Sequence, residues 1–186
     1  MKTRAFVFVS VLALLLMGCK KDDEGTTPPV AAEDWTFPTD TVKFAVTVNS
    51  PKATVAVGEA FDVKVILYNV SNAFGFSMEM AYASDKVEVL EVTQGPHFAP
   101  VGDLLTIKKI DAAMNAVSYG VTFKAGTTTT GKSGSGVVFK LKCRARVAGS
   151  AAFTIAPGKL EIRKADGSFI NNFNTIAKEN LTLQIQ

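Results

Sequence analysis

The sequence predicts an all-β protein whose strands form an antiparallel sandwich or barrel. From Thr41 onward, apolar and polar residues alternate with a period of two, which places successive side chains on opposite faces of a strand. Gly, Pro, Asn and Asp interrupt these runs at short intervals, as expected for turns between strands. No run of the sequence keeps the spacing of an amphipathic helix. Short strands of this kind bury one face each when two sheets pack together or one sheet closes on itself.

Each candidate strand is an alternating or apolar run that ends at turn residues. In chain order the runs are 42–48, 53–57, 61–68, 74–82, 86–92, 104–110, 116–123, 137–147, 151–155, 159–164, 168–173 and 181–185. The run 74–82 is the clearest, because its large apolar side chains fall on one phase. These are Phe74, Phe76, Met78, Met80 and Tyr82, with Gly75, Ser77, Glu79 and Ala81 on the opposite phase. Asp166-Gly167 is a strong hairpin signal between two later runs.

The first residues carry targeting information. Lys2 and Arg4 precede AFVFVSVLALLLM, an apolar run that is short for a membrane span and typical of a signal peptide. The run ends in LMGC, residues 16–19, which resembles a bacterial lipobox. That resemblance implies that residues 1–18 are removed and that Cys19 becomes the lipidated first residue. An ordinary secretory signal with a chance Cys is the alternative.

Residues 19–41 are expected to form a flexible tether, because charged and Thr/Pro-rich residues offer little apolar surface to bury. Lys20 stands where an inner-membrane retention signal would have Asp. CKKDDE resembles the signal that sends some lipoproteins to the outer leaflet of the outer membrane. We therefore expect a surface-exposed outer-membrane lipoprotein that carries one domain, residues 42–186. That length suits a single hydrophobic core.

Charge and cysteine content exclude some classes of function. The formal charge falls from +3 to +1 when Lys2 and Arg4 leave with the signal, which argues against a nucleic-acid partner. With Cys19 lipidated, Cys143 has no partner for an intramolecular disulfide. Cys143 is in phase with apolar neighbours, so a small buried side chain is favoured over a reactive thiol.

Two stretches of the sequence resemble a cohesin domain. They are ATVAVGEAFDVKVILYNVSNAFGFSMEMAYASDKVEVLEVTQG, residues 53–95, and SGSGVVFKLKCRARVAGSAAFTI, residues 133–155. The resemblance covers about 42–186 and implies a nine-stranded antiparallel jelly-roll β-sandwich without catalytic activity. It also implies docking of a dockerin-type protein in polysaccharide degradation, through the sheet that contains 61–68 and 137–147. Related sandwiches bind polysaccharides, so a surface glycan-binding lipoprotein is the alternative.

Outward residues on those two strands are the predicted partner-binding residues. Lys140, Lys142, Arg144 and Arg146 alternate with apolar residues that include Val137 and Phe139, and so form a basic stripe. The stripe suits an acidic partner, although it could equally keep a strand soluble or be balanced by acids on neighbouring strands. Lys64, Ile66 and Tyr68 would lie beside it and supply an apolar centre, unless a loop covers them.

Enzyme and cofactor functions find little support in the sequence. His97 is the single His, so no metal set of His and Cys is possible, and no pair of acids is placed as a general acid and base. We expect no enzyme activity, no catalytic residues and no cofactor. The sequence does not exclude calcium binding, since loop carboxylates and carbonyls can bind the ion without a regularly spaced motif. The single Trp, Trp35, falls in the tether, which weakens the case for an aromatic sugar platform.

GTTTTGKS, residues 126–133, matches the phosphate-binding P-loop pattern. A P-loop requires a strand before it and a helix after it, so that the helix N-terminus faces the phosphate. Here the following residues, GSGVVFKLKCRARV, predict a strand. We therefore expect a connecting loop and no nucleotide.

Overall fold

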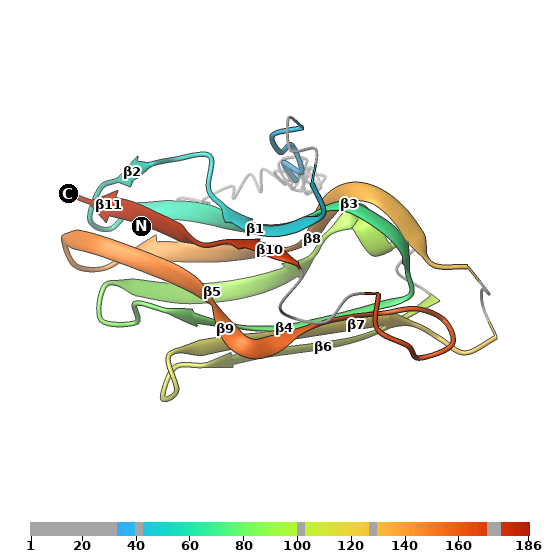
Figure 1. Cartoon of the computed structure of the whole chain (residues 1–186). Coiled ribbons are helices and arrows are strands. Elements are labelled where there is room, and N and C mark those ends of the chain that lie inside the picture. Colours follow the sequence, from blue (N-terminus) through green and yellow to red (C-terminus); the bar gives the residue numbers. More distant parts are fainter. Residues whose placement is uncertain (1–32, 40–42, 100–102, 127–129, 171–175) are drawn as a thin grey trace, which may run out of the picture. The chain divides into compact units, whose positions relative to one another are not determined.

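A computed structural model describes residues 33–39, 43–99, 103–126, 130–170 and 176–186. In the part of the chain from Asp34 onward, two β-sheets pack face to face (Figure 1). One sheet has five strands in the order β10-β1-β3-β8-β5, and the other has six in the order β2-β11-β9-β4-β7-β6. The prediction of an all-β sandwich is confirmed. Within these residues no helix is long and apolar enough to cross a membrane.

The five-stranded sheet consists of β1 (Ala45–Asn49), β3 (Ala60–Ala73), β5 (Val87–Gln94), β8 (Lys132–Ala145) and β10 (Ala177–Glu179). The six-stranded sheet consists of β2 (Thr54–Val55), β4 (Gly75–Tyr82), β6 (Leu104–Asp111), β7 (Ala116–Phe123), β9 (Gly149–Arg163) and β11 (Leu181–Ile185). A 3₁₀ turn, η1 (Pro96–Phe98), follows β5.

The strand count and pairing differ from the expected nine antiparallel strands. The described residues form eleven strands, and β1 pairs with β10, and β11 with β2, in parallel. The predicted strands 151–155 and 159–164 are one continuous strand, β9. Of the predicted strand 168–173, the described part makes only an isolated bridge between Phe169 and Arg163. The short strand β10 was not predicted, because three residues are too few to show a period.

The core lies between the sheets and uses the predicted alternation. In β4, Phe76, Met78, Met80 and Tyr82 are buried on the inner side. Aromatic rings join the two layers: Tyr119 of β7 stacks on Phe139 of β8 with ring centroids 4.3 Å apart. Burial of each large apolar side chain contributes roughly 1.5–3 kcal/mol, so this shared core holds the two sheets together.

β3 and β8 continue through the region predicted to be a turn. Asn69 and Asn72 adopt left-handed backbone angles, φ 50° and 59°, where Asn is tolerated better than most residues. Their backbone N–H groups donate to the hydroxyls of Ser135, at 3.0 Å, and Ser133, at 2.9 Å. These bonds replace ladder bonds that the irregular register interrupts.

In the pair of β3 and β8, one residue faces the side opposite to the one predicted. Val137 was expected to share the inner face with Phe139. The register shifts between Val65 and Ile66, so that Val65 lies opposite Phe139 and Ile66 lies opposite Val137. The extra residue, Val138, turns into the core, whereas Val137 packs on the outer face. A β-bulge therefore reverses the alternation at this point, which a strict two-residue period cannot anticipate.

The residues that spell the P-loop pattern do not build one. Lys132 and Ser133 begin strand β8, where the motif would need a helix. Asn72 Oδ1 accepts a hydrogen bond from the Gly131 N–H, and the Ser133 hydroxyl is bonded to the Asn72 N–H. Thr127 to Thr129 lie outside the described residues. The prediction that a strand follows this sequence is confirmed.

Candidate docking faces

The outer face of the six-stranded sheet carries a trough formed by unequal side chains in register. Ile107 of β6 lies opposite Gly120 of β7, which lies opposite Ser77 of β4, which lies opposite Glu161 of β9. The next row runs Leu105, Thr122, Gly75 and Arg163 in the same strand order. Large apolar residues thus stand on one edge, small residues cover the middle, and charged residues form the opposite edge.

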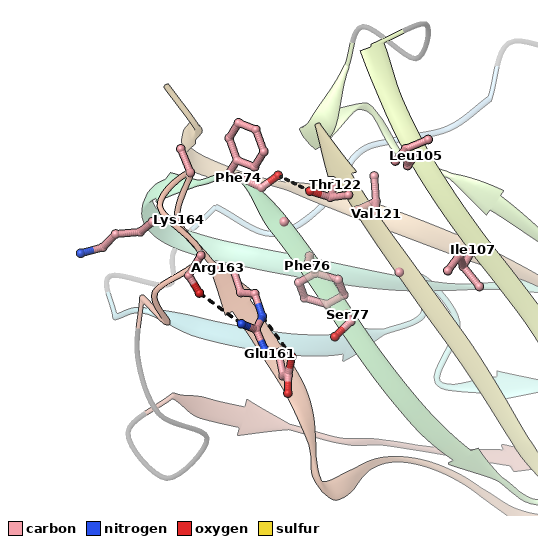
Figure 2. Close-up of a pocket in the computed structure, with 14 residues that line it drawn as sticks. Phe74, Phe76, Ser77, Leu105, Ile107, Val121, Thr122, Glu161, Arg163 and Lys164 are labelled. Carbon is pink, nitrogen blue, oxygen red and sulfur yellow. Dashed lines mark hydrogen bonds and ion pairs between the residues drawn. The ribbon is translucent and has the colours of Figure 1, made fainter. Parts of the chain in front are cut away.

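The trough combines exposed apolar side chains with a surface hollow. Leu105 is 57% exposed and Ile107 is 73% exposed, which is unusual for large apolar side chains in a strand. The hollow beside them holds about 500 Å³, and Figure 2 shows Leu105 and Ile107 on one side of it, with Ser77 between them and Glu161. A second hollow of about 330 Å³ continues along the sheet and shares Ser77, Ile107, Gly120 and Glu161.

The charged edge of the trough is held by several contacts. The Arg163 guanidinium donates to Glu161 Oε2 at 3.0 Å and to the Gly167 carbonyl at 3.1 Å (Figure 2). It also lies 4.2 Å from the centroid of the Phe169 ring. A guanidinium held in one place can present its remaining donors to a partner with little loss of side-chain entropy.

β6 is the edge strand of its sheet, and polar contacts anchor it. Lys109 pairs with Asp111 at 2.7 Å, and this contact raises the pKa of Lys109 and lowers that of Asp111. On the other side of the strand, Lys108 donates to the Val92 carbonyl at 3.1 Å, and Thr106 to Gln94 Oε1 at 2.8 Å. These bonds tie β6 to β5 of the opposite sheet, while Leu105 and Ile107 stay exposed.

The outer face of the five-stranded sheet holds the predicted partner-binding residues, and part of it is covered. Lys64, Ile66 and Tyr68 do point to the outer side, but each is at most 2% exposed. Residues 34–38, from the predicted tether, lie against them: Lys64 Nζ is 2.8 Å from Asp34 Oδ2, and the Tyr68 hydroxyl donates to the Pro38 carbonyl at 2.8 Å. The sequence left open whether a loop covers these three residues, and in the structure residues 34–38 do so.

The predicted basic stripe is divided by this cover. Lys140 is 6% exposed and lies 3.3 Å from Asp62 Oδ2, whereas Lys142 and Arg144 are exposed, as is Arg146 after the strand. Burial, together with the neighbouring Lys142, lowers the pKa of Lys140.

Acids on the neighbouring strands balance the stripe. Asp62 and Glu91 lie opposite Lys142, and Glu88 lies opposite Arg144. This arrangement agrees with the alternative named from the sequence, in which acids on neighbouring strands balance the charge of the stripe. A role for the stripe in partner binding stays a prediction.

Other candidate residues fall outside any docking face. His97 lies in η1, and burial lowers its pKa to about 4. Cys143 is buried, burial raises its pKa, and it serves as a small core side chain, as favoured from its phase. Among the described residues, no group of three His, Cys, Asp or Glu side chains could hold a metal. The signal region and Cys19 lie outside those residues.

Sequence reasoning missed Leu105 and Ile107. Their run, LLTIKKI, has apolar residues on both phases, so it does not say which side faces the core. The small residues opposite gave a usable signal: Gly120 and Ser118 alternate with Val117, Tyr119 and Val121. A phase of small residues beside an exposed apolar strand indicates a hollow only once the strand order is known.

Two facing sheets place the chain in the class of β-sandwich domains. A family model of the cohesin domain matches residues 44–175, and the chain belongs to this family. This confirms the resemblance found in the sequence. No curated protein matches the chain.

Solved cohesin structures share the fold. A non-cellulosomal cohesin from the archaeon Archaeoglobus fulgidus is 23% identical, with a TM-score of 0.61, covering 77% of this chain and 91% of that one. A type II cohesin from Acetivibrio cellulolyticus is 11% identical, with a TM-score of 0.65 and coverage of 75% and 94%. One chain of a type I cohesin–dockerin complex from Clostridium thermocellum is 14% identical, with a TM-score of 0.65; the match covers 81% of this chain and 99% of that one. At these identities the likeness concerns the fold.

Proposed function

We propose that this protein is a non-catalytic docking module that holds a dockerin-type protein through the outer face of its six-stranded sheet. The observation that carries the proposal is the trough, where exposed Leu105 and Ile107 stand beside a floor of Gly120 and Ser77. Protein interfaces combine apolar side chains that lose water on binding with polar or charged side chains beside them, and the trough offers both. The family supports the type of partner, because solved relatives include complexes with dockerins.

The proposed site differs from the face that the sequence favoured. Residues 34–38 cover Lys64, Ile66 and Tyr68, so a partner would have to displace them before it could contact that face. The trough needs no such displacement. Binding there costs no free energy for removing a covering segment.

The proposed location is the outer surface of the outer membrane, with a lipid on Cys19 as the anchor. The support is the LMGC sequence, the lack of Asp after Cys19 and the charged segment CKKDDE. Incorporation of labelled palmitate into the wild-type chain but not into Cys19→Ala would test the anchor. Digestion of the protein on intact cells by added protease would test surface exposure.

The docking function is tested by retaining partners from the secreted and surface proteins of the source bacterium on the immobilised chain. We expect wild-type protein to retain a dockerin-type partner, and the variant Leu105→Asp/Ile107→Asp to lose it. The matched control, Lys142→Glu/Arg144→Glu, changes exposed residues on the other sheet and should retain the partner. No partner on the wild-type chain, or equal loss from both variants, would contradict the proposal.

Glycan binding by a surface lipoprotein is the alternative function. Tyr82 and Tyr119 point into the core, and Tyr68 is covered, so none of these rings offers a stacking platform on the described surface. A polysaccharide array separates the two functions. Binding to one polysaccharide that survives Leu105→Asp/Ile107→Asp would favour the alternative.

A further inference from the structure

The outer face of the five-stranded sheet holds residues 34–38 as a docked peptide. These residues form no strand, and Figure 1 shows them in blue on the side of β1, β3 and β8 that faces away from the six-stranded sheet. Their hydrogen bonds to the sheet come from side chains: Lys64 Nζ donates to the Thr36 carbonyl at 2.8 Å, and the Tyr68 hydroxyl donates to that of Pro38. Recognition of this kind depends on the peptide's side chains and two of its carbonyls.

A buried ammonium contacts the first residue of the segment, Asp34, whose own side chain is 54% exposed. Lys64 is nearly fully buried, with its side chain 3% exposed, and its ammonium contacts Asp34 Oδ2 at 2.8 Å. The Asp34 carboxylate is held in position for this contact, because its other oxygen accepts hydrogen bonds from the Thr36 N–H at 2.9 Å and from the Thr36 hydroxyl at 2.7 Å. A buried ammonium needs an acceptor, so this position selects for a carboxylate.

Two aromatic positions follow the acid. The Lys140 ammonium lies 5.1 Å from the centroid of the Trp35 ring, within the range of a cation–π contact. Phe37 meets Tyr68 edge to face, with centroids 5.9 Å apart and planes at 74°. Both rings are half-buried and cover an apolar cluster of Ala45, Ile66, Tyr68 and Val137, each at most 2% exposed.

We propose that this face is a second binding surface, specific for a peptide with a carboxylate and two aromatic rings, and that the chain's own residues 34–38 occupy it in cis. The surface is separate from the trough, so this inference does not depend on the proposed docking function. Because the segment is joined to β1 through a few residues, its effective concentration at the face is in the millimolar range. The segment therefore stays bound only if its intrinsic dissociation constant is below about 1 mM.

The first test supplies the segment in trans to a full-length chain whose own segment is disabled. The variant Asp34→Ala/Trp35→Ala/Phe37→Ala leaves the sheet residues unchanged. A synthetic, dye-labelled peptide with the sequence of residues 34–39 is titrated against it and followed by fluorescence anisotropy. We expect saturable binding with a dissociation constant below about 1 mM. Binding to the wild-type chain, whose face is occupied, should be weaker by about two-fold at that limit and by about ten-fold if the dissociation constant is about 0.1 mM.

Matched controls identify the surface. A labelled peptide with Asn in place of the Asp34 equivalent, and the further change Lys64→Met in the vacated chain, should each weaken binding at least about ten-fold. Leu105→Asp/Ile107→Asp in the same chain should leave peptide binding unchanged. Lack of saturable binding up to several millimolar, or equal binding to vacated and wild-type chains, would overturn the proposal.

A second test needs no disabled segment. Trp35 is the single Trp of the chain, so its emission reports directly on the segment in the full-length protein. Tyr68→Phe, which removes the hydrogen bond to Pro38, and Lys64→Met should each shift the emission to longer wavelength and increase quenching by acrylamide. Phe169→Ala, on a distant loop, is the control. Emission that stays unchanged in both sheet variants would equally overturn the proposal.

Discussion

The two outer faces of this sandwich contain the same kinds of residue but bury them differently. On the six-stranded sheet, Leu105 and Ile107 are exposed beside small neighbours. On the five-stranded sheet, even Lys64 is buried, because residues 34–38 lie over it. The comparison shows that the exposure of a sheet face depends on what the rest of the chain places over it. Apolar residues on the uncovered face bury little surface on folding, which agrees with the docking role proposed for them.

The largest expected effect is a difference in stability between a substitution on the covered face and one on the uncovered face. Tyr68→Ala should lower the free energy of unfolding by about 3 kcal/mol, because it removes a buried ring, its contact with Phe37 and its hydrogen bond to Pro38. Leu105→Ala should change it by less than about 0.5 kcal/mol. Urea unfolding of both variants measures the difference. Equal losses would mean that the trough is as important for folding as the covered face.

The next prediction concerns His97 in the 3₁₀ turn η1, which belongs to neither outer face. Burial holds the pKa of His97 at about 4, below the 6.5 of the unburied side chain, and Lys132 adds to this effect. Between these pH values the unfolded chain binds a proton that the folded chain does not, so stability falls as the pH drops from 6.5 toward 4. The loss should reach about 2–3 kcal/mol.

The variant His97→Phe should remove most of this pH dependence, as measured by urea unfolding at pH 7, 5.5 and 4.5. A variant that keeps the full dependence would assign the effect to other groups. The control is Lys132→Ala, which should reduce the dependence only slightly, because the lysine is the smaller cause of the shift.

A smaller effect is expected when the trough is filled. A Cβ at Gly120 would lie 3.9 Å from Ser77 Cβ and 4.0 Å from Ile107 Cβ, which is ordinary contact, so the backbone accepts a side chain there. Gly120→Val should leave stability nearly unchanged and weaken partner binding about ten-fold or more, about 1.4 kcal/mol. Calorimetric titration of the retained partner measures this change. Binding that is unaffected by Gly120→Val would place the interface elsewhere.

The smallest expected effect is a pH response of the covered face. The hydrogen bond from the Lys64 ammonium holds the pKa of Asp34 well below its usual range. The stabilisation is therefore present above the ordinary Asp pKa of 3.8 and is lost as the pH falls below it. Trp35 emission should be constant from pH 7 to 5 and shift only in more acidic solution. An emission change centred near pH 6 would contradict this assignment.

Alternation in the sequence predicted the fold class and the core side of β4, because a strand with one buried face must place apolar residues on every second position. The two cohesin-like stretches predicted the family. The sequence also predicted that Lys64, Ile66 and Tyr68 point away from the core. It misplaced Val137, since a bulge adds one residue and leaves no mark in the composition of the strand.

Tertiary structure alone decided which outer face is open. Burial of Lys64 depends on Asp34, thirty residues earlier, and the trough depends on four strands whose order, β9-β4-β7-β6, is not their order in the chain. A segment such as DWTFPT contains too little apolar surface to fold alone, so its composition suggests a tether. Its carboxylate and rings become ordered because a preformed sheet offers them a buried ammonium and an apolar cluster. Contacts of this kind exist only after the sandwich has formed, and for this reason local sequence patterns did not predict them.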